Sequence, residues 1–359
     1  MTVALAAAGT GGHVYPALAV ADALIEAGTK RRAIVFFGGS RMEAETVPAA
    51  GYEFVQVDIH GLRRSLSKDN LELPGLIRKA TRQIAAELER RRVGSVGVFG
   101  GYISVPAALA ARRTGAAIVV HEQNAHPGIA NRLIAPRARS TFVAFPEAQR
   151  RLKHSRLVGN PLRKPFNRFS REELRSEARE RYGVPAGLPI LGVLGGSLGA
   201  KVLNEITVRI AADADPGSLG IVHLTGPTHL EGLTPVARRS PLPWVTRAFE
   251  PDMEYFYAVA DVVLARAGAL TVSELAATGT PAVLVPLEAT HQDENTRMLE
   301  AAGGALVVRQ SDIDRVPVEL QQLIVDVSRR EEMAAAARTL ATPDAARVVA
   351  GELLEAAGG

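Results

Sequence analysis

The sequence predicts an α/β protein built from two Rossmann-like domains that face each other across a cleft. Three observations support this fold class. The chain has 359 residues, enough for two domains that each bury a core. In both halves, short β-branched runs alternate with stretches of helical periodicity, which implies βαβ units and mostly parallel sheets. The pattern breaks near the middle of the chain, where a linker is expected.

Strands and helices can be assigned in order along both halves. The expected strands of the first half are 3–8, 33–37, 54–57, 96–99, 117–120 and 141–144, and its expected helices are 15–27, 73–91 and 104–113. The second half repeats the scheme with strands 190–194, 221–224, 262–265, 282–285 and 305–308, helices 200–212, 270–278 and 295–302, and a helical tail from Val318. Two prolines interrupt the pattern in 159–169. We expect domains over 1–160 and 161–359, with the last helix a candidate to pack back on the first domain.

Composition narrows the class of protein. Hydrophobic residues make up 47% and charged residues 22%, as in ordinary globular proteins. The absence of cysteine excludes disulfides, thiolate metal sites and a cysteine nucleophile, and fits a reducing cytoplasm. The N-terminus resembles a strand rather than a signal peptide, and no apolar run approaches the roughly 18 residues of a membrane span. We therefore expect a soluble or peripheral protein.

Charge is distributed unevenly along the chain. Residues 1–163 contain 23 Lys and Arg against 12 Asp and Glu, a net +11, whereas the remainder contains 19 against 26, a net −7. Leu73, Leu76 and Ile77 stand among six basic residues: Arg63, Arg64, Lys68, Arg78, Lys79 and Arg82. The segment suits an anionic membrane surface, at about 1 kcal/mol per basic residue, or an amphipathic helix with a buried face. The basic first half favours the membrane. Nucleic acid is not expected, because aromatic residues are few and show no stacking pattern.

Four glycine-rich loops follow predicted strands. They span 9–13, 100–102, 195–200 and 268–271. Glycine lets the backbone approach a ligand, and the N-terminus of the following helix favours a phosphate group. Strand-to-helix turns also need glycine for structural reasons alone, so one such loop decides little. Four of them, two in each half, favour ligands that carry phosphate.

Two common nucleotide-binding motifs and the H-E-x-x-H metal motif are absent. No loop ends in Gly-Lys-Ser/Thr, which excludes a P-loop. No loop reads G-x-G-x-x-G, and the second strand ends in Gly38-Gly39-Ser40 without the acidic residue that a dinucleotide ribose requires, so a nicotinamide dehydrogenase is not expected. Asp213 and Asp215 run into Pro216-Gly217 and fit a solvated turn better than a metal-diphosphate site. We expect no metal.

Two polar groups are candidates for the chemistry. His13 directly follows the first glycine cluster, where an imidazole could accept a proton from an attacking hydroxyl. It could instead cap the helix or fill a corner of the core. The run 121–124, His-Glu-Gln-Asn, follows another strand and should reach the cleft as well. Within it we expect Gln123 to be a solvated loop residue.

An ordered set of motifs resembles a known family. The set comprises Thr10-Gly11-Gly12-His13-Val14-Tyr15-Pro16, Gly100-Gly101-Tyr102, His121-Glu122-Gln123-Asn124, Gly159-Asn160-Pro161-Leu162-Arg163, Gly195-Gly196-Ser197 and Gly268-Ala269-Leu270-Thr271-Val272-Ser273-Glu274. It covers almost the whole chain and resembles the N-acetylglucosaminyltransferases that convert lipid I to lipid II in peptidoglycan synthesis. No single motif is decisive, but the ordered set is highly specific.

The resemblance implies a glycosyltransferase B fold and an inverting transfer without cofactor. N-acetylglucosamine would move from UDP-N-acetylglucosamine to the 4-hydroxyl of N-acetylmuramyl-pentapeptide on undecaprenyl diphosphate. The enzyme would work as a peripheral protein at the cytoplasmic face of the cell membrane. A UDP-sugar epimerase and a non-catalytic nucleotide-sugar binding protein remain the alternatives.

The resemblance also assigns roles to residues. Ser197 and the following helix N-terminus would contact the donor diphosphate, and Arg163 would reach the UDP. Glu274 would accept hydrogen bonds from the ribose, and Gln292 would contact the sugar hydroxyls. His13 would be the general base. The remaining binding residues are Thr10, Gly11, Gly12, Tyr102 and Asn124 for the sugar and acceptor, and Ala269, Leu270, Thr271, Val272 and Ser273 for the nucleotide. The glycine loops of the first half would serve the lipid diphosphate, and those of the second half would serve UDP.

Overall fold

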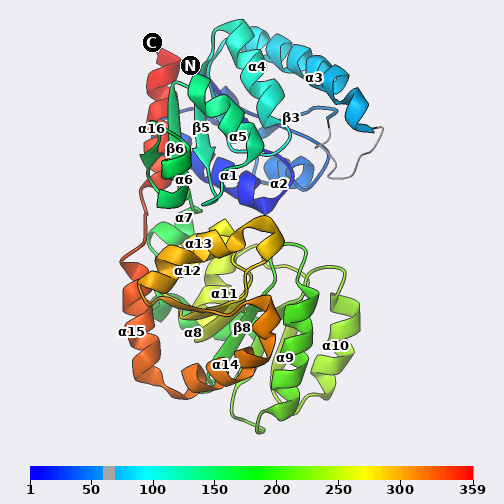
Figure 1. Cartoon of the computed structure of the whole chain (residues 1–359), viewed down its shortest axis with the longest axis vertical. Helices are drawn as coiled ribbons and strands as arrows, with labels where there is room; N and C mark the ends of the chain where they lie inside the picture. Colours follow the sequence, from blue (N-terminus) through cyan, green and yellow to red (C-terminus); the bar gives the residue numbers. More distant parts are fainter. Residues whose placement is uncertain (60–68, 359) are drawn as a thin grey trace. The chain divides into compact units, whose positions relative to one another are not determined.

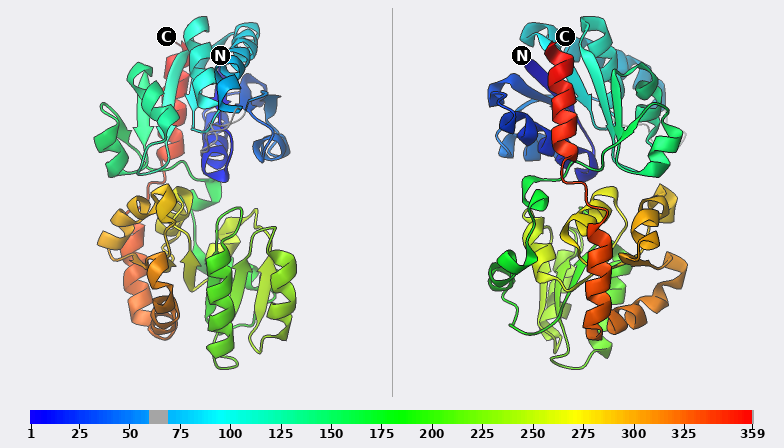
Figure 2. Two further views of the ribbon diagram at one scale, coloured as in Figure 1. Left: turned by 45° about the vertical axis from the view of Figure 1, so that its right-hand side comes forward. Right: turned by 90° about the vertical axis from the view of Figure 1, so that its left-hand side faces the viewer.

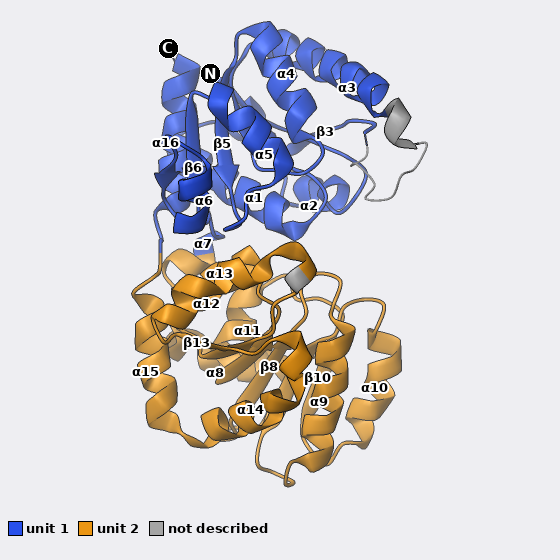
Figure 3. Cartoon of the chain, viewed as in Figure 1, with its two compact units in different colours: residues 1–164, 342–359 blue, residues 165–341 orange. Residues whose placement is uncertain are grey.

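The chain forms two compact units. The computed structural model describes residues 1–59 and 69–358. Unit 1 comprises Met1–Lys164 and Thr342–Gly359, and unit 2 comprises Pro165–Ala341 (Figure 3). The change from unit 1 to unit 2 after Lys164 falls inside the expected linker 159–169, and the final helix belongs to unit 1.

Unit 1 contains a seven-stranded parallel sheet in the order β3-β2-β1-β4-β5-β6-β7 (Figure 1). Its strands are β1 Thr2–Ala6, β2 Ile34–Gly38, β3 Glu53–Gln56, β4 Val93–Val98, β5 Ala117–Glu122, β6 Ser140–Val143 and β7 Arg156–Leu157. The strand order reverses between β1 and β4. In open parallel sheets, ligands bind outside the carboxyl ends of the strands at such a reversal.

Helices cover both faces of this sheet. They are α1 Gly11–Glu26, α2 Glu43–Ala49, α3 Asp69–Arg91, α4 Ser104–Thr114, α5 Ile129–Ile134, α6 Pro146–Arg151 and α16 Ala345–Gly358, with α7 Lys164–Asn167 at the border between the units. Side chains alternate along β1, so that Val3 and Leu5 pack with α1 and α16 while Ala4 and Ala6 pack with α3 and α4. Figure 2 shows α16 in red against the unit 1 sheet.

Unit 2 repeats the arrangement with a six-stranded parallel sheet in the order β10-β9-β8-β11-β12-β13. Its strands are β8 Ile190–Leu194, β9 Gly220–Leu224, β10 Trp244–Arg247, β11 Val262–Ala265, β12 Ala282–Leu284 and β13 Ala305–Val307. Its helices are α8 Arg171–Tyr182, α9 Lys201–Asp213, α10 Leu230–Arg239, α11 Met253–Val259, α12 Ala269–Thr278, α13 Gln292–Ala301, α14 Val316–Val325 and α15 Val327–Arg338. The reversal of strand order lies between β8 and β11.

The predicted fold class is confirmed, and every predicted strand and helix has a counterpart. The pattern missed two strands and several short or polar helices: β7, β10, α2, α5, α6, α7, α8, α10 and α11. The reason is clearest for α8, whose sequence REELRSEARERY offers few apolar residues from which to read a periodicity. None of the described helices combines the length and apolar character needed to cross a membrane.

Candidate active site

The four predicted glycine loops follow the two central strands of each sheet. The loops 9–13 and 100–102 follow β1 and β4, the strands that flank the reversal in unit 1. The loops 195–200 and 268–271 follow β8 and β11, which flank the reversal in unit 2. Each unit therefore has a glycine-lined edge where a doubly wound sheet binds ligands.

Close backbone packing explains the glycines of unit 1. Gly9 has a φ of +102° and Gly101 a φ of +81°, in the region that favours glycine. A Cβ on Gly101 would lie 2.2 Å from the carbonyl oxygen of Ala8, so a side chain there would push the two loops apart. Thr10 is the N-cap of α1 without a side-chain cap bond, and no acidic residue stands in the first turn of the helix. The backbone N–H groups at the start of α1 therefore suit an anion.

His13 lies in the first turn of α1 and is half-buried. Its Nδ1 lies 3.0 Å from the carbonyl oxygen of Ala8. A carbonyl oxygen can only accept, so Nδ1 carries the proton and Nε2 keeps a lone pair. Burial lowers the pKa of His13 below its usual 6.5, although Glu122, the Ala8 bond and Glu43 act in the opposite direction. The imidazole is therefore neutral at neutral pH and has Nε2 available as a base.

Glu43 is a buried carboxylate that the sequence pattern did not single out. It is 0% exposed and accepts bonds from the amides of Gly9 and Gly39 at 3.1 and 3.0 Å. A third bond comes from the hydroxyl of Tyr102 at 2.8 Å. The loops after β1, β2 and β4 thus all donate hydrogen bonds to the carboxylate of Glu43. Glutamate is rarely fully buried, so the sequence pattern contains no signal for this contact.

Tyr102, a predicted substrate-binding residue, is tied to the protein through its hydroxyl. Burial, and then the bond to Glu43, raise the pKa of Tyr102. A Cβ on Gly39 would lie 2.1 Å from the Tyr102 oxygen, so this glycine makes room for the contact. The ring of Tyr102 lies beside Gly9. Any contact of Tyr102 with a ligand would therefore use the ring face rather than a free hydroxyl.

The end of β5 is more buried than expected. His121 and Gln123 are each 1% exposed, so the prediction of Gln123 as a solvated loop residue is wrong. Nε2 of His121 donates to the Gly159 carbonyl at 2.9 Å, and Gln123 donates to Nδ1 of His121 at 3.0 Å. Burial lowers the pKa of His121 to about 4. Gln123 is buried because it satisfies an imidazole nitrogen that has no access to water.

Glu122 shapes the loop that contains Asn124. Its carboxylate accepts bonds from the amides of Asn124 and Gly128 at 2.9 and 3.0 Å, and from Nδ2 of Asn131 at 2.9 Å. Asn124 is half-buried, and its side chain also points to Glu122, with Nδ2 at 3.4 Å. Glu122 therefore fixes the backbone on which Asn124 is carried.

Arg163 belongs to unit 1. Its guanidinium carbon lies 5.2 Å from the centre of the Tyr15 ring, on the first turns of α1. Such a cation–π contact orients the side chain. The structure thus brings Thr10, Gly11, Gly12, His13 and Tyr102 together around the β1 and β4 loops, with Asn124 after β5 and Arg163 beside α1.

The glycine loop after β8 is held by the turn after β9. Gly199 has a φ of +76°, and a Cβ there would lie 2.1 Å from the Thr225 carbonyl oxygen. Asn204 donates to that same oxygen at 3.2 Å. Ser197 is exposed in the loop, and α9 begins after Ala200 without a side-chain cap. An anion at this edge would meet the exposed Ser197 and the uncapped N–H groups of α9.

The start of α12 is the second place in unit 2 where an uncapped helix N-terminus could bind an anion. Gly268 is its N-cap, again without a side-chain cap bond, and no acidic residue occupies the first turn. Glu274 lies in the second turn and accepts a bond from the Tyr257 hydroxyl at 2.8 Å. Val272 is 4% exposed, and the Ser273 hydroxyl donates to the Ala269 carbonyl at 3.0 Å. Of this run, Leu270, Thr271, Ser273 and Glu274 are only half-buried, whereas Val272 faces the core.

Gln292 begins α13 and closes the preceding loop. Its Oε1 accepts a bond from the Leu287 amide at 3.0 Å. One turn later, Nδ2 of Asn295 donates to the Ala267 carbonyl at 3.0 Å, next to the glycine loop after β11. The start of α13 is therefore attached to the same loop as α12. The sequence motif includes Gln292 but contains no signal for the Asn295 bond, which joins segments 28 positions apart.

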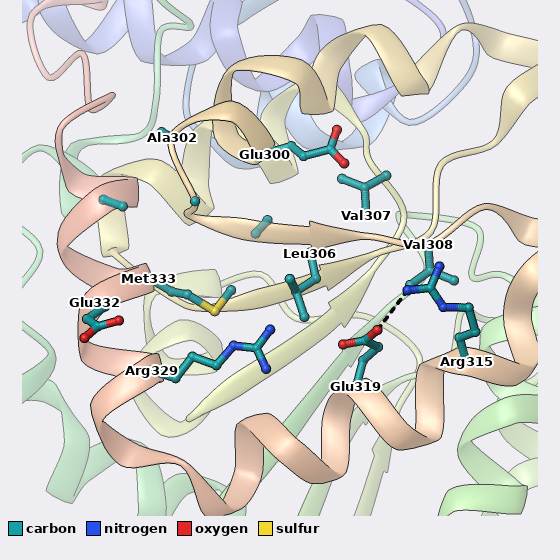
Figure 4. A pocket seen from close by; sticks show the side chains of 13 residues that line it. Glu300, Ala302, Leu306, Val307, Val308, Arg315, Glu319, Arg329, Glu332 and Met333 are labelled. Atoms are coloured by element: carbon teal, nitrogen blue, oxygen red, sulfur yellow. Dashed lines mark hydrogen bonds and ion pairs between the residues drawn. The ribbon is translucent and has the colours of Figure 1, made fainter.

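A cavity of about 550 Å³ lies elsewhere in unit 2. It lies beside the edge strand β13 and is walled by α14, α15 and the end of α13, with the ion pair of Arg315 and Glu319 at 3.0 Å on its rim (Figure 4). No predicted site residue lines it. This cavity is thus separate from the glycine loops.

Comparison with known proteins agrees with this arrangement. Residues 3–143 match the model of the glycosyltransferase family 28 N-terminal domain, and residues 190–349 match that of its C-terminal domain. The two matches contain β1 to β6 and β8 to β13, respectively, and so include all four glycine loops.

Curated relatives match over the full length. The UDP-N-acetylglucosamine--N-acetylmuramyl-(pentapeptide) pyrophosphoryl-undecaprenol N-acetylglucosamine transferase of Streptomyces coelicolor is 38% identical, with 99% of this chain and 98% of the relative covered. The protein of the same name from Halorhodospira halophila is 40% identical, with 97% and 96% covered.

A solved structure shows the same architecture. The crystal structure of Acinetobacter baumannii MurG matches with a TM-score of 0.74 and 30% identity, covering 99% of this chain and all of that one. Solved glycosyltransferases of lower identity, such as CalG4 at 18% and a TM-score of 0.66, share the fold. The chain belongs to glycosyltransferase family 28 and, within it, to the family of UDP-N-acetylglucosamine--N-acetylmuramyl-(pentapeptide) pyrophosphoryl-undecaprenol N-acetylglucosamine transferases.

Proposed function

We propose that this enzyme transfers N-acetylglucosamine from its UDP form to the 4-hydroxyl of N-acetylmuramyl-pentapeptide on undecaprenyl diphosphate, which converts lipid I to lipid II. The relatives that match over the full length are named for this transfer. One observation in the chain carries the mechanism: Nδ1 of His13 is bonded to the Ala8 carbonyl, so Nε2 is the basic nitrogen. It stands beside a glycine loop that suits a phosphate.

In the proposed reaction His13 acts as general base. Nε2 removes the proton of the acceptor 4-hydroxyl while that oxygen attacks the anomeric carbon of the donor sugar. The bond from the anomeric carbon to the phosphate oxygen breaks, and UDP leaves with the bonding electrons. A single displacement inverts the configuration at this carbon. The base needs a neutral imidazole, and burial of His13 supplies it by lowering the pKa.

The donor would be held by unit 2. The uncapped starts of α9 and α12 present backbone N–H groups, which stabilise the charge that develops on the leaving UDP. Ser197 would add a hydroxyl donor, and Arg163 would add a positive charge. Glu274, oriented by Tyr257, would accept hydrogen bonds from the ribose. Ala269 to Ser273 would line the nucleotide, partly through their backbone, since Val272 is buried.

Unit 1 would receive the acceptor. The loops 9–13 and 100–102 offer backbone groups to the lipid diphosphate, with Thr10, Gly11, Gly12, Tyr102 and Asn124 positioning its sugars. Unit 1 also contains most of the excess positive charge. A diphosphate carried by a lipid requires the enzyme to work at a membrane, so we place it as a peripheral protein on the cytoplasmic face of the cell membrane.

We propose that residues 74–82 of α3, together with the neighbouring α4, form the surface that contacts the membrane. Ala80, Ile84 and Leu88 are buried in the core, so the later part of α3 fits the amphipathic-helix interpretation. Earlier in the helix, Pro74 and Ile77 border a cavity of about 390 Å³. Arg78, Thr81, Leu109, Arg112 and Arg113 complete its lining. Apolar and basic groups that share an open surface suit anionic lipid. Arg63, Arg64 and Lys68, named in the sequence for the same role, lie outside the described residues.

Turnover of the purified enzyme tests the function. UDP-N-acetylglucosamine with a soluble lipid I analogue should yield UDP and the disaccharide product, and His13→Ala should lower kcat by about 100-fold to 10,000-fold. The affinity for UDP, measured by calorimetry, should stay within about twofold. Lack of turnover with intact UDP binding would instead favour a nucleotide-sugar binding protein. Conversion of the donor in the absence of acceptor would favour an epimerase.

A further inference from the structure

One peptide group separates the buried carboxylate Glu43 from His13. The amide N–H of Gly9 and the carbonyl of Ala8 belong to the same peptide bond, which is planar and places the two groups on opposite sides. The N–H donates to Oε2 of Glu43 at 3.1 Å. The carbonyl oxygen lies 3.0 Å from Nδ1 of His13 and accepts its proton. Carboxylate, peptide and imidazole therefore form one continuous chain of hydrogen bonds.

We propose that Glu43 is a positioning residue for His13, acting through the peptide group that joins Ala8 to Gly9. The inference rests on the proposed role of His13 as general base. A carboxylate that fixes the peptide N–H also fixes the direction of the carbonyl. The carbonyl in turn keeps the proton on Nδ1 and leaves Nε2 to the acceptor. A negative charge at one end of such a chain also polarises the bonds along it.

The surroundings of Glu43 support a task that needs a carboxylate. All three groups that face it are donors: the amides of Gly9 and Gly39 and the hydroxyl of Tyr102. Oε1 accepts from Gly39 and Tyr102, and Oε2 accepts from Gly9. A carboxylate offers acceptor oxygens to all three of them, whereas a glutamine amide in its place would offer only one acceptor oxygen. Gly38 leaves no room for a side chain either, since a Cβ there would lie 2.8 Å from Cγ of Glu43.

The Ala8 carbonyl is held from its other side as well. Gly101, in the loop after β4, packs so closely that a Cβ would lie 2.2 Å from this oxygen. Gly100 packs against the His13 ring, where a Cβ would lie 2.7 Å from Cδ2. The peptide and the imidazole are thus confined between Glu43 and the β4 loop. Displacement of a general base by about 1 Å can lower a rate by about 100-fold, which makes such confinement relevant to catalysis.

Glu43→Gln tests the proposal because it changes one bond selectively. A glutamine amide has one acceptor oxygen and one NH₂ donor. Its oxygen can serve Gly39 and Tyr102, but its NH₂ group then faces the N–H of Gly9. In spectra of ¹⁵N-histidine-labelled protein, wild-type His13 should carry its proton on Nδ1, and Glu43→Gln should populate the Nε2–H tautomer. The kcat should fall by about 10-fold to 100-fold, with UDP affinity unchanged.

Two variants separate positioning from general loss of stability. Glu250 in unit 2 is also 0% exposed and accepts bonds from the Tyr182 hydroxyl at 2.7 Å and the Asp252 amide at 3.0 Å. Glu250→Gln should therefore destabilise the protein without changing the His13 tautomer. Tyr102→Phe leaves the Gly9 bond intact and should keep the Nδ1–H form. If Glu43→Gln keeps the wild-type tautomer and a kcat within about twofold, Glu43 has no positioning role.

A measurement on the wild-type protein needs no variant. The Gly9 amide, bonded to a buried carboxylate, should exchange with deuterium at least about tenfold more slowly than the Gly12 amide in the first turn of α1. Equal exchange rates would overturn the proposal even if Glu43→Gln failed to fold. The tautomer and exchange measurements do not depend on turnover. If wild-type protein lacks activity, the proposed function fails while these results still decide the role of Glu43.

Discussion

A single neighbouring residue decides which ring nitrogen of His13 carries the proton. The sequence identified this histidine because it follows the glycine cluster. Which nitrogen is basic follows from the carbonyl of Ala8, which only the folded backbone brings to Nδ1. Glu43 was not found for the same reason, since it is separated from Gly9 by 34 positions and meets it only when β1 and β2 are paired. Gln123 was misjudged because its partner, His121, is buried with it.

The pH dependence of turnover follows from the environment of His13. Only the neutral imidazole can accept a proton, so activity is lost as the pH falls through the pKa. Burial lowers this pKa below 6.5. We therefore expect kcat/KM to be nearly constant between about pH 7 and 8 and to reach half its maximum below about pH 6.5. A pH–rate profile of the free enzyme measures this.

The residual activity of His13→Ala is the control for that profile. The pH–rate profile of this variant should show no loss of activity as the pH falls from about 7 to about 6. A half-maximum at or above about pH 6.5 in the wild-type enzyme would contradict the assignment of this loss of activity to the half-buried His13.

At the scale of elements, the glycine loops combine two requirements. They must turn from strand to helix, and their backbones must touch a neighbouring loop. The sequence predicted the loops because glycine and strand patterns are local. It could not reveal that Gly199 packs on Thr225 or that Gly101 packs on Ala8, since each pair joins different strands of a sheet. The strand β10 was missed because all four of its residues are half-buried, so no buried apolar run marks it.

Gly199→Ala should weaken donor binding through this contact. The new Cβ would lie 2.1 Å from the Thr225 carbonyl oxygen and would displace the loop in front of α9. We expect the affinity for UDP to fall by about tenfold or more, comparable to the loss of one charge-assisted hydrogen bond. Isothermal titration calorimetry measures the change.

Gly217→Ala is the matched control. Gly217 has a φ of +78°, close to the +76° of Gly199, but nothing lies within 4 Å of its Cβ position. It should lose roughly 1 to 2 kcal/mol of stability from the strained backbone and keep wild-type affinity for UDP. Equal affinity losses in both variants would show that strain, not the loop contact, is responsible.

The basic residues of α3 give a second prediction for an element. Replacing Arg78, Lys79 and Arg82 with alanine removes three exposed charges beside the surface formed with α4. Binding to vesicles containing anionic lipid should weaken by about tenfold or more, given about 1 kcal/mol per charge before screening. Sedimentation with vesicles measures it.

The control for this variant removes the same charge from unit 2. Arg209, Arg238 and Arg239 are exposed there, and their replacement with alanine should leave vesicle binding unchanged. Unaltered binding by the α3 variant would contradict the proposed membrane surface. An equal loss in both variants would show that only net charge matters.

At the scale of the whole molecule, the chain builds two units with separate cores. Unit 1 is completed by α16, although this helix comes last in the sequence. Leu353 is fully buried between α1 and the sheet, and its carbonyl accepts a bond from Ser95 of β4 at 2.7 Å. The C-terminal helix therefore packs against β4 and against α1, the helix that carries His13.

Leu353→Ala should destabilise unit 1 selectively. Truncating a buried leucine costs about 2 to 5 kcal/mol. Trp244 is the sole tryptophan of the chain and lies in unit 2. Thermal unfolding followed by circular dichroism should therefore begin earlier, whereas the transition in tryptophan fluorescence should stay in place.

Leu320→Ala is the corresponding change in unit 2, where this leucine is also fully buried. It should shift the fluorescence transition. If Leu353→Ala shifts both signals together, the two units unfold as one cooperative system.

The sequence by itself determined the class of fold, the order of most elements, the position of the glycine loops and the family. These properties rest on local patterns and on ordered motifs, which can be read along one dimension. The tertiary structure decided which strands lie side by side, that α16 completes unit 1, that Gln123 is buried, and that Glu43 reaches the peptide behind His13. These depend on contacts between distant segments, because hydrogen bonds and packing act across a few ångströms of space and not along the chain.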